Sequence, residues 1–124
     1  MAVKERLEEG APELDKIEAR ASENPNEFEP QLELGWALYG RDRTQEALDQ
    51  LKQVVQRFPE EAEAHYALGL AHKRAGNHSE ATQAFQKAIE SADKSLEGVR
   101  SDMMLRLAKR QIHLIEHGTW DLKE

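Results

Sequence analysis

The segment LELGWALYG at residues 32–40 recurs in outline 34 residues later, as YALGLAHKR at residues 66–74. Both segments contain Leu-Gly-x-Ala, so that Gly35 falls on Gly69. A fixed period of this size indicates a stack of small units, none of which buries its apolar face alone. Such a stack favours a function in which a surface meets a partner over one in which a pocket carries chemistry.

Each unit has the apolar pattern of two helices that face each other. The first helix has apolar or small residues along one side, and the second has a facing stripe at steps of four and three residues. In the first unit these residues are Leu34, Gly35 and Leu38, then Ala47, Leu51 and Val54. Because Gly35 and Ala47 are small, as are Gly69 and Ala81 one period later, we expect these two pairs to be the closest contacts between helices.

Turn and capping residues predict where the helices begin and end. Pro59 stops the first pair near Phe58, and Gly76 suits the left-handed conformation that ends a helix. Asn77 and Glu80 have the spacing of a capping box at the start of the next helix. We therefore expect antiparallel helix pairs at residues 28–40 with 44–58, and at residues 62–75 with 79–92.

These features resemble the tetratricopeptide repeat, a helix pair with Leu-Gly, Ala, Phe, Ala and a closing Pro at fixed places. Residues 28–61 match it through Leu34-Gly35, Ala47 and Pro59, and residues 62–95 match it through Leu68-Gly69, Ala81, Phe85 and Ala88. Departures are Gln31 and His65 at the large apolar place, Leu38 and His72 at the aromatic place, and Asp93 at the second proline. The resemblance implies an all-α solenoid, and an unrelated bundle with a chance repeat is disfavoured by the shared register.

The same frame extends beyond the two full repeats. One period earlier, Leu14, Ile17, Ala21 and Pro25 continue the pattern, which predicts a half repeat over residues 11–25. After the second repeat, Met104, Leu107, Ala108 and Gln111 can be laid on His65, Leu68, Gly69 and His72 with five extra residues around positions 91–100. We expect a capping helix over residues 96–117 and loosely held ends at residues 1–10 and 118–124, all within one domain of residues 1–124.

Composition limits the class of protein. The chain has 124 residues, no cysteine and a formal charge of −7, and no apolar run approaches the length of a signal peptide or membrane span. We therefore expect a cytoplasmic protein that binds neither nucleic acid nor membranes, since nucleic acid attracts basic surfaces. A fragment of a larger chain would have the same composition.

Residue patterns typical of enzymes are missing from the sequence. It has no Gly-rich phosphate loop, no nucleophile elbow and no cysteine nucleophile. His113 and His117 are four residues apart with Glu116 beside them, so both rings could face one metal ion, but no third ligand has an assigned place. We therefore expect no enzyme activity, no cofactor and no metal site.

The resemblance places the binding surface on the concave face, which the first helix of each unit lines in such stacks. The residues that we expect there, spaced at four and three residues on each helix, are Leu32, Trp36 and Tyr39, then Tyr66, Leu70, Lys73 and Arg74, with Leu105 and Lys109 from the closing helix. Trp, Tyr and Arg often dominate binding energy at interfaces. The sequence thus predicts an interaction module or adaptor that binds a peptide or helix of another protein.

Two other readings of the same surface stay open. Trp36 and Tyr39 could be covered by the end segments and belong to the core, because apolar residues at helical spacing are most often core. Alternatively, the apolar groove, or the face of residues 103–115, could join two copies of the chain as a homodimer.

Repeats of this family that hold the acidic tails of heat-shock chaperones use a clamp of Lys and Asn with further basic residues. Here the corresponding places carry Leu32, Trp36 and Ala67, so a carboxylate clamp is not expected. An apolar or mixed peptide with an acidic residue near Lys73 and Arg74 fits the sequence better.

Overall fold

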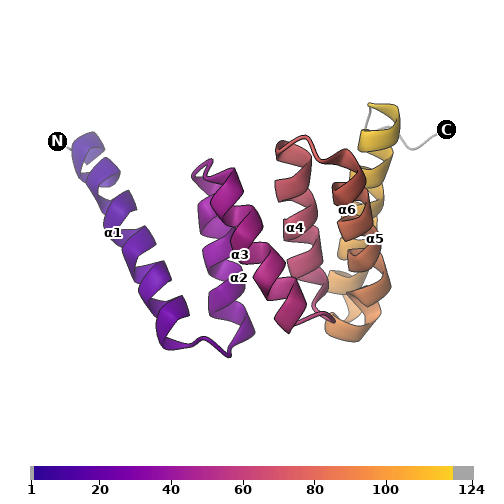
Figure 1. The fold of residues 1–124 in the computed structure, drawn as a ribbon, viewed down its shortest axis with the longest axis horizontal. Coiled ribbons are helices and arrows are strands. Elements are labelled where there is room, and N and C mark those ends of the chain that lie inside the picture. Colours follow the sequence, from indigo (N-terminus) through magenta and orange to yellow (C-terminus); the bar gives the residue numbers. More distant parts are fainter. Residues whose placement is uncertain (1, 119–124) are drawn as a thin grey trace.

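The computed structural model of the protein describes the backbone of residues 2–118 and the side chains of residues 13–118. This part of the chain forms six α-helices and no strand, arranged side by side in chain order (Figure 1). The helices are α1 (Ala2–Glu23), α2 (Phe28–Gly40), α3 (Thr44–Arg57), α4 (Ala62–Arg74), α5 (His78–Ser95) and α6 (Gly98–His117). The all-α solenoid predicted from the sequence is confirmed.

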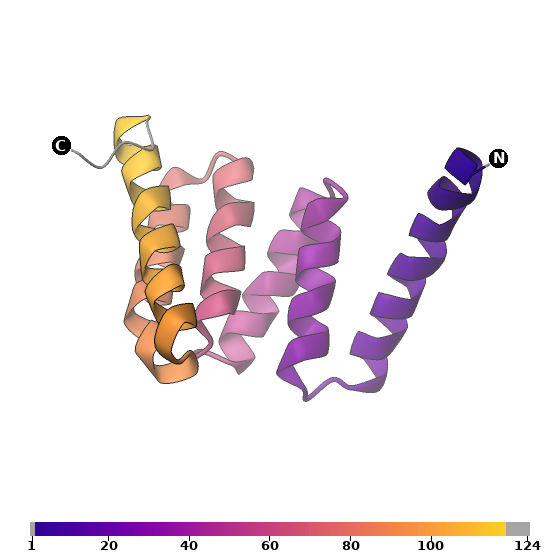
Figure 2. The ribbon, with the colours of Figure 1, turned by 180° about the vertical axis from the view of Figure 1, so that it is seen from behind.

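Alternate helices of the stack line opposite faces. Each helix packs against the next one in the chain, and α4 also contacts both α2 and α6. Seen from behind, α2 lies in front of α3 and α6 lies in front of α5 (Figure 2). The helices α2, α4 and α6 therefore share one face, on which the binding surface was expected.

The predicted bounds of the two helix pairs agree with the structure within a few residues. The main difference is α5, which continues to Ser95 because Asp93 stands where the first repeat has Pro59. The extra residues thus lengthen the end of a helix, and the Ser101 hydroxyl of α6 donates to the Asp93 carboxylate at 2.7 Å. The predicted capping box is wrong, because the Asn77 side chain caps no helix and instead lies 3.2 Å from Nδ1 of His72.

The closest contacts at the glycines differ from those predicted. The side chain nearest to Gly35 is that of Leu51, and the one nearest to Gly69 is that of Phe85, rather than Ala47 and Ala81. A Cβ atom added at Gly69 would lie 2.5 Å from Cε1 of Phe85. Two small residues that face each other leave space, and this space is filled by the large side chain one turn further along the second helix.

Two clusters of buried side chains form the core. The first joins α2, α3 and α4 and includes Ala84 of α5, and the second joins α4, α5 and α6. Leu51 and Phe85 are fully buried, and Leu68 is 8% exposed, as expected from the repeat. Full burial of a side chain of this size contributes about 1.5–3 kcal/mol.

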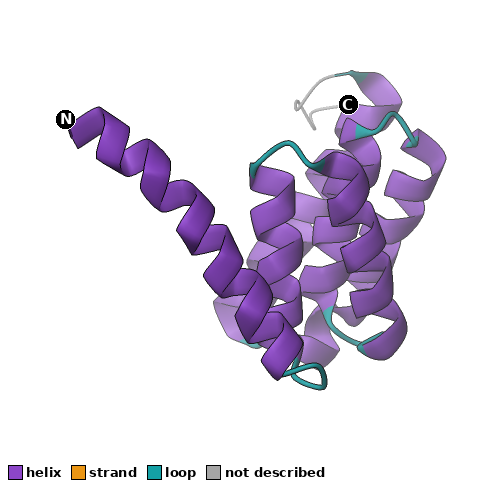
Figure 3. Ribbon diagram, turned by 60° about the vertical axis from the view of Figure 1, so that its left-hand side comes forward, coloured by secondary structure: helices purple, strands orange, loops and turns teal. Residues whose placement is uncertain are grey.

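The first helix is longer than predicted. It begins at Ala2 rather than near residue 11, because residues 2–9 are rich in the helix formers Lys, Glu, Arg and Leu. Leu14, Ile17 and Ala21 are buried, as the half-repeat alignment predicts. The N-terminal part of α1 leans away from the other helices (Figure 3). The expectation of loosely held ends at residues 1–10 and 118–124 falls mostly outside the described part, which includes no side chain before residue 13 and no residue after 118.

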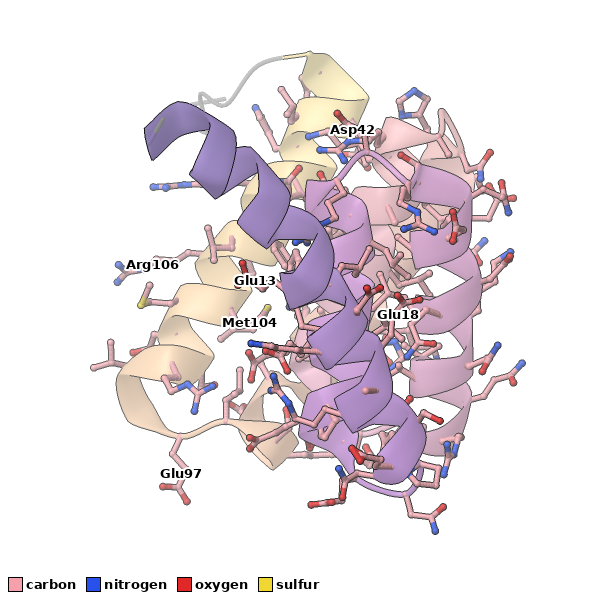
Figure 4. All side chains as sticks on the ribbon, turned by 90° about the vertical axis from the view of Figure 1, so that its left-hand side faces the viewer. Glu13, Glu18, Asp42, Glu97, Met104 and Arg106 are labelled. Atoms are coloured by element: carbon pink, nitrogen blue, oxygen red, sulfur yellow. The ribbon has the colours of Figure 1, made fainter. Side chains whose placement is uncertain are left out.

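The alignment of the closing helix on the repeat agrees with burial at three of its four residues and fails at Leu107. Leu107, which was laid on Leu68, is 39% exposed, whereas Met104 and Ala108 are buried. Gln111 is buried as well, so the three residues laid on His65, Gly69 and His72 are all buried as these are. Arg106 points away from the neighbouring helices while Met104 points toward them (Figure 4), so α6 buries one face only.

Candidate partner-binding groove

A hollow of about 1080 Å³ lies where the end of α1 and the first turns of α2, α4 and α6 meet. We call it the groove. Its lining residues are Arg20, Glu27, Phe28, Glu29, Pro30, Leu32, Glu33, Trp36, Glu61, Glu63, Ser95, Leu96 and Arg100. The volume is slightly above the range of about 300–1,000 Å³ that is typical of small-molecule pockets. It is therefore large enough for several side chains of a bound segment.

The apolar part of the groove comes from α2 and from the link between α5 and α6. Leu32 and Leu96, each 8% exposed, contribute apolar surface to its lining. Trp36 packs against the first core cluster while part of its surface remains accessible, and its ring meets that of Tyr39 edge-on at 6.1 Å. The Trp36 side chain is thus partly buried in the core and partly exposed to solvent.

The other aromatic residues expected on this face have contacts within the protein. The Tyr39 ring lies beneath the Arg74 guanidinium, at 3.7 Å from its centre. Tyr66 packs against Phe85 at 5.4 Å, and its hydroxyl accepts a hydrogen bond from Gln111 at 3.3 Å. Burial raises the pKa of the Tyr66 hydroxyl. Neither tyrosine lines the groove.

The two cations expected to receive an acidic partner residue are engaged inside the protein. Lys73 donates to the Gln111 side chain at 2.7 Å, which links α4 to α6, and burial lowers the pKa of its ammonium group. Arg74 donates to the Tyr39 carbonyl at 2.7 Å and lies 3.4 Å from the Asp42 carboxylate. These contacts join successive units of the stack, because both side chains stand at the end of α4, next to α2 and α6.

The remaining predicted residues also lie away from the groove. Leu70 and Leu105 are partly buried against the second core cluster, and Lys109 is exposed on α6. The structure thus brings together Leu32 and Trp36 of the predicted set in one hollow, and places the other members beside or beyond it.

Carboxylates at the groove were missed by the sequence analysis. Glu33 pairs with Arg20 at 2.5 Å and Glu63 pairs with Arg100 at 2.9 Å, while Glu27, Glu29 and Glu61 have no partner among the described side chains. Burial, followed by the charges of Glu63 and Glu29, raises the pKa of Glu61. The signal was present in the repeat frame, which lays Glu27 on Glu61 and Glu29 on Glu63.

Two exposed apolar residues of α6 lie beside the groove. Met103 is 54% exposed, and together with Leu107 it lines a second hollow of about 160 Å³. This hollow shares Glu63, Leu96 and Arg100 with the groove, so the two are adjacent. The sequence pattern had placed Leu105 on the concave face and had offered residues 103–115 as an interface between two copies.

The histidines have structural contacts. His65 and His72 are buried between helices, and Nε2 of His65 lies 2.8 Å from the Pro59 carbonyl, as expected for packed residues. The rings of His113 and His117 stack at 4.4 Å. No cluster of three or more metal-ligating side chains occurs in the part of the chain that the structure describes. Among the described helices, none is long and apolar enough to span a membrane.

Comparison with known proteins agrees with this architecture. The family model of the tetratricopeptide repeat matches residues 32–95, which is more than half of the chain. The chain is similar to the solved structure named "MamA MSR-1 C2", with 28% sequence identity and a TM-score of 0.63. That match covers 72% of this chain and 51% of the other, so this chain spans about half the length of the protein it matches. No curated protein matched the chain. The chain belongs to the tetratricopeptide-repeat family.

Proposed function

We propose that this protein is an adaptor whose groove receives a peptide or helix of a partner protein. Repeats of this family generally mediate interactions between proteins rather than catalysis. The observation that carries the proposal is Trp36, a large aromatic side chain that is partly accessible in a hollow lined by residues of α1, α2, α4, α5 and α6. A rigid aromatic residue at the centre of a concave surface is the usual anchor of an interface.

The charge of the chain supports a protein partner over nucleic acid or an anionic membrane, and we propose that this partner is met in the cytoplasm. The formal charge is −7, and the groove has five carboxylates against two guanidinium groups among its described lining residues. Such a surface repels phosphates. We propose that binding requires neither a cofactor nor a metal.

A Trp36→Ala variant tests the proposal. The purified protein is used to select from a phage-displayed library of random short peptides, and a selected peptide is then titrated by calorimetry. We expect Trp36→Ala to weaken binding by about 30-fold, which corresponds to about 2 kcal/mol, with a small change in melting temperature. Val55→Ala, at a partly buried position on α3, is the matched control and should leave binding unchanged.

A homodimer is the second candidate function. It is favoured by the apolar residues that α6 exposes, namely Val99, Met103 and Leu107. Contiguous exposed apolar surface often marks an interface. Analytical ultracentrifugation over a range of concentrations distinguishes the two functions. The dimer would replace the adaptor proposal if two results were obtained together. The wild type would form a tight dimer that the Met103→Glu, Leu107→Glu variant does not form, and no selected peptide would depend on Trp36 for binding.

A further inference from the structure

The starts of α2 and α4 each present a pair of glutamates to the groove. Glu27 and Glu29 at the start of α2 fall on Glu61 and Glu63 at the start of α4 in the repeat frame. Glu27 and Glu61 stand at the N-cap positions of α2 and α4, yet neither side chain makes a capping hydrogen bond. Ser, Thr, Asp and Asn are the residues that normally cap helices there. The carboxylate groups of Glu27 and Glu61 therefore keep their hydrogen-bonding capacity for a ligand.

The negative charge around the groove exceeds what the protein neutralises. Arg20 and Arg100 each pair with one glutamate, Glu33 and Glu63 respectively. Three carboxylates remain without a partner among the described side chains. The pKa of the Glu61 carboxyl is raised by burial and then by the negative charges of Glu63 and Glu29. A cation from outside would relieve this repulsion.

The unpaired carboxylates border an apolar floor. Phe28, Leu32, Trp36 and Leu96 line the same hollow as Glu29 and Glu61. A ligand that filled the hollow would thus meet apolar surface and negative charge side by side. An acidic residue would face three unpaired carboxylates here, while Lys73 and Arg74 are already engaged within the stack.

We infer that the groove selects a peptide segment in which a lysine or arginine lies close to an apolar residue. The apolar side chain packs on Trp36 and Leu32, and the cation pairs with Glu29 and Glu61. This inference rests on the proposed function of the groove, and it replaces the acidic partner residue expected from the sequence. The overall negative charge also speeds the approach of such a segment at low salt.

The experiment selects peptides with the wild-type protein and then compares the affinity of the wild type and of charge variants for them. The probe is the phage-displayed library of random short peptides, and the variant is Glu29→Gln, Glu61→Gln, which keeps the shape of both side chains. The control is Glu18→Gln, Glu90→Gln, which removes the same charge from exposed positions of α1 and α5 outside the groove. We expect the selected peptides to be rich in Lys or Arg near aromatic or aliphatic residues.

Affinity for a synthetic selected peptide should fall about tenfold or more in Glu29→Gln, Glu61→Gln and stay unchanged in the control. Raised salt should weaken wild-type binding more than that of the groove variant. Melting curves distinguish a loss of binding from a loss of folding. We expect neither glutamine variant to lower the melting temperature.

The outcomes separate the inference from the proposed function. Peptides that need Trp36 but lack basic residues, or that bind Glu29→Gln, Glu61→Gln as tightly as the wild type, overturn the inference and leave the adaptor function standing. A library that yields no peptide dependent on Trp36 overturns both.

Discussion

Gly69 and Phe85 are in direct contact across the two helices of the second repeat, since a Cβ atom at Gly69 would lie 2.5 Å from Cε1 of the ring. The same relationship holds one period earlier between Gly35 and Leu51. Each glycine lets a large side chain of the second helix sit directly on the backbone of the first. This contact holds α4 against α5, and α4 in turn carries Glu63 to the groove.

Gly69→Ala should destabilise the protein by about 1–3 kcal/mol, because the added methyl group meets a fully buried ring that has no room to move. Gly40→Ala is the control, since a Cβ atom there meets nothing within 4 Å. Urea unfolding measures both. Equal effects at the two glycines would contradict the contact described here.

Leu68→Ala should lower the free energy of unfolding by about 2–5 kcal/mol, the usual loss when a large core side chain is truncated. Gln83→Ala, at an exposed position on α5, should change it by about 0.5 kcal/mol or less. Thermal and urea unfolding of the three proteins would show the difference. A Leu68 variant as stable as the wild type would mean that this position is not core.

Glu61→Gln should raise the free energy of unfolding at neutral pH. Burial and the nearby Glu63 and Glu29 make the pKa of Glu61 higher in the folded chain than in the unfolded one. Such a carboxyl destabilises the fold when it is charged. The destabilisation is complete at pH values above the folded pKa and absent below the unfolded pKa of about 4.3. The advantage of the variant should therefore shrink as the pH falls toward about 4. An advantage that grew on acidification would show that the sign is wrong. Glu90→Gln is the control.

The stability of the wild type should fall in mild acid because of His72. Burial, followed by the charge of Lys52, lowers the pKa of this histidine in the fold, and Asn77 Nδ2 lies 3.2 Å from its Nδ1. The neutral ring is thus favoured. Its contribution is complete above the unfolded pKa of about 6.5 and is lost as the pH falls from there through the folded value.

Urea unfolding at several values between about pH 7.5 and pH 5 checks this expectation. His72→Gln should flatten the pH dependence, whereas His78→Gln, at an exposed position, should keep the wild-type slope. If both variants kept the full slope, another group would be responsible.

The sequence by itself determined the helix pairs and their core. The period of 34 residues and the spacing of residues such as Leu51 and Phe85 depend only on which side of its own helix a residue occupies. The limits of α2 to α4 were predictable for the same reason, because Gly, Pro and polar residues mark the turns between them. Trp36 and Leu32 were found in this way too.

Only the tertiary structure decided which side chains surround the groove. Lys73 and Arg74 were expected to be available, but the neighbouring units supply Gln111, Tyr39 and Asp42 as their partners. Glu29 and Glu61 come together because the first turns of α2 and α4 lie side by side. Helical periodicity gives the direction of a side chain on its own helix, whereas distances between helices depend on how they pack. The exposure of Leu107 escaped prediction for a related reason, because the way α6 packs on α5 decides which of its apolar residues are covered.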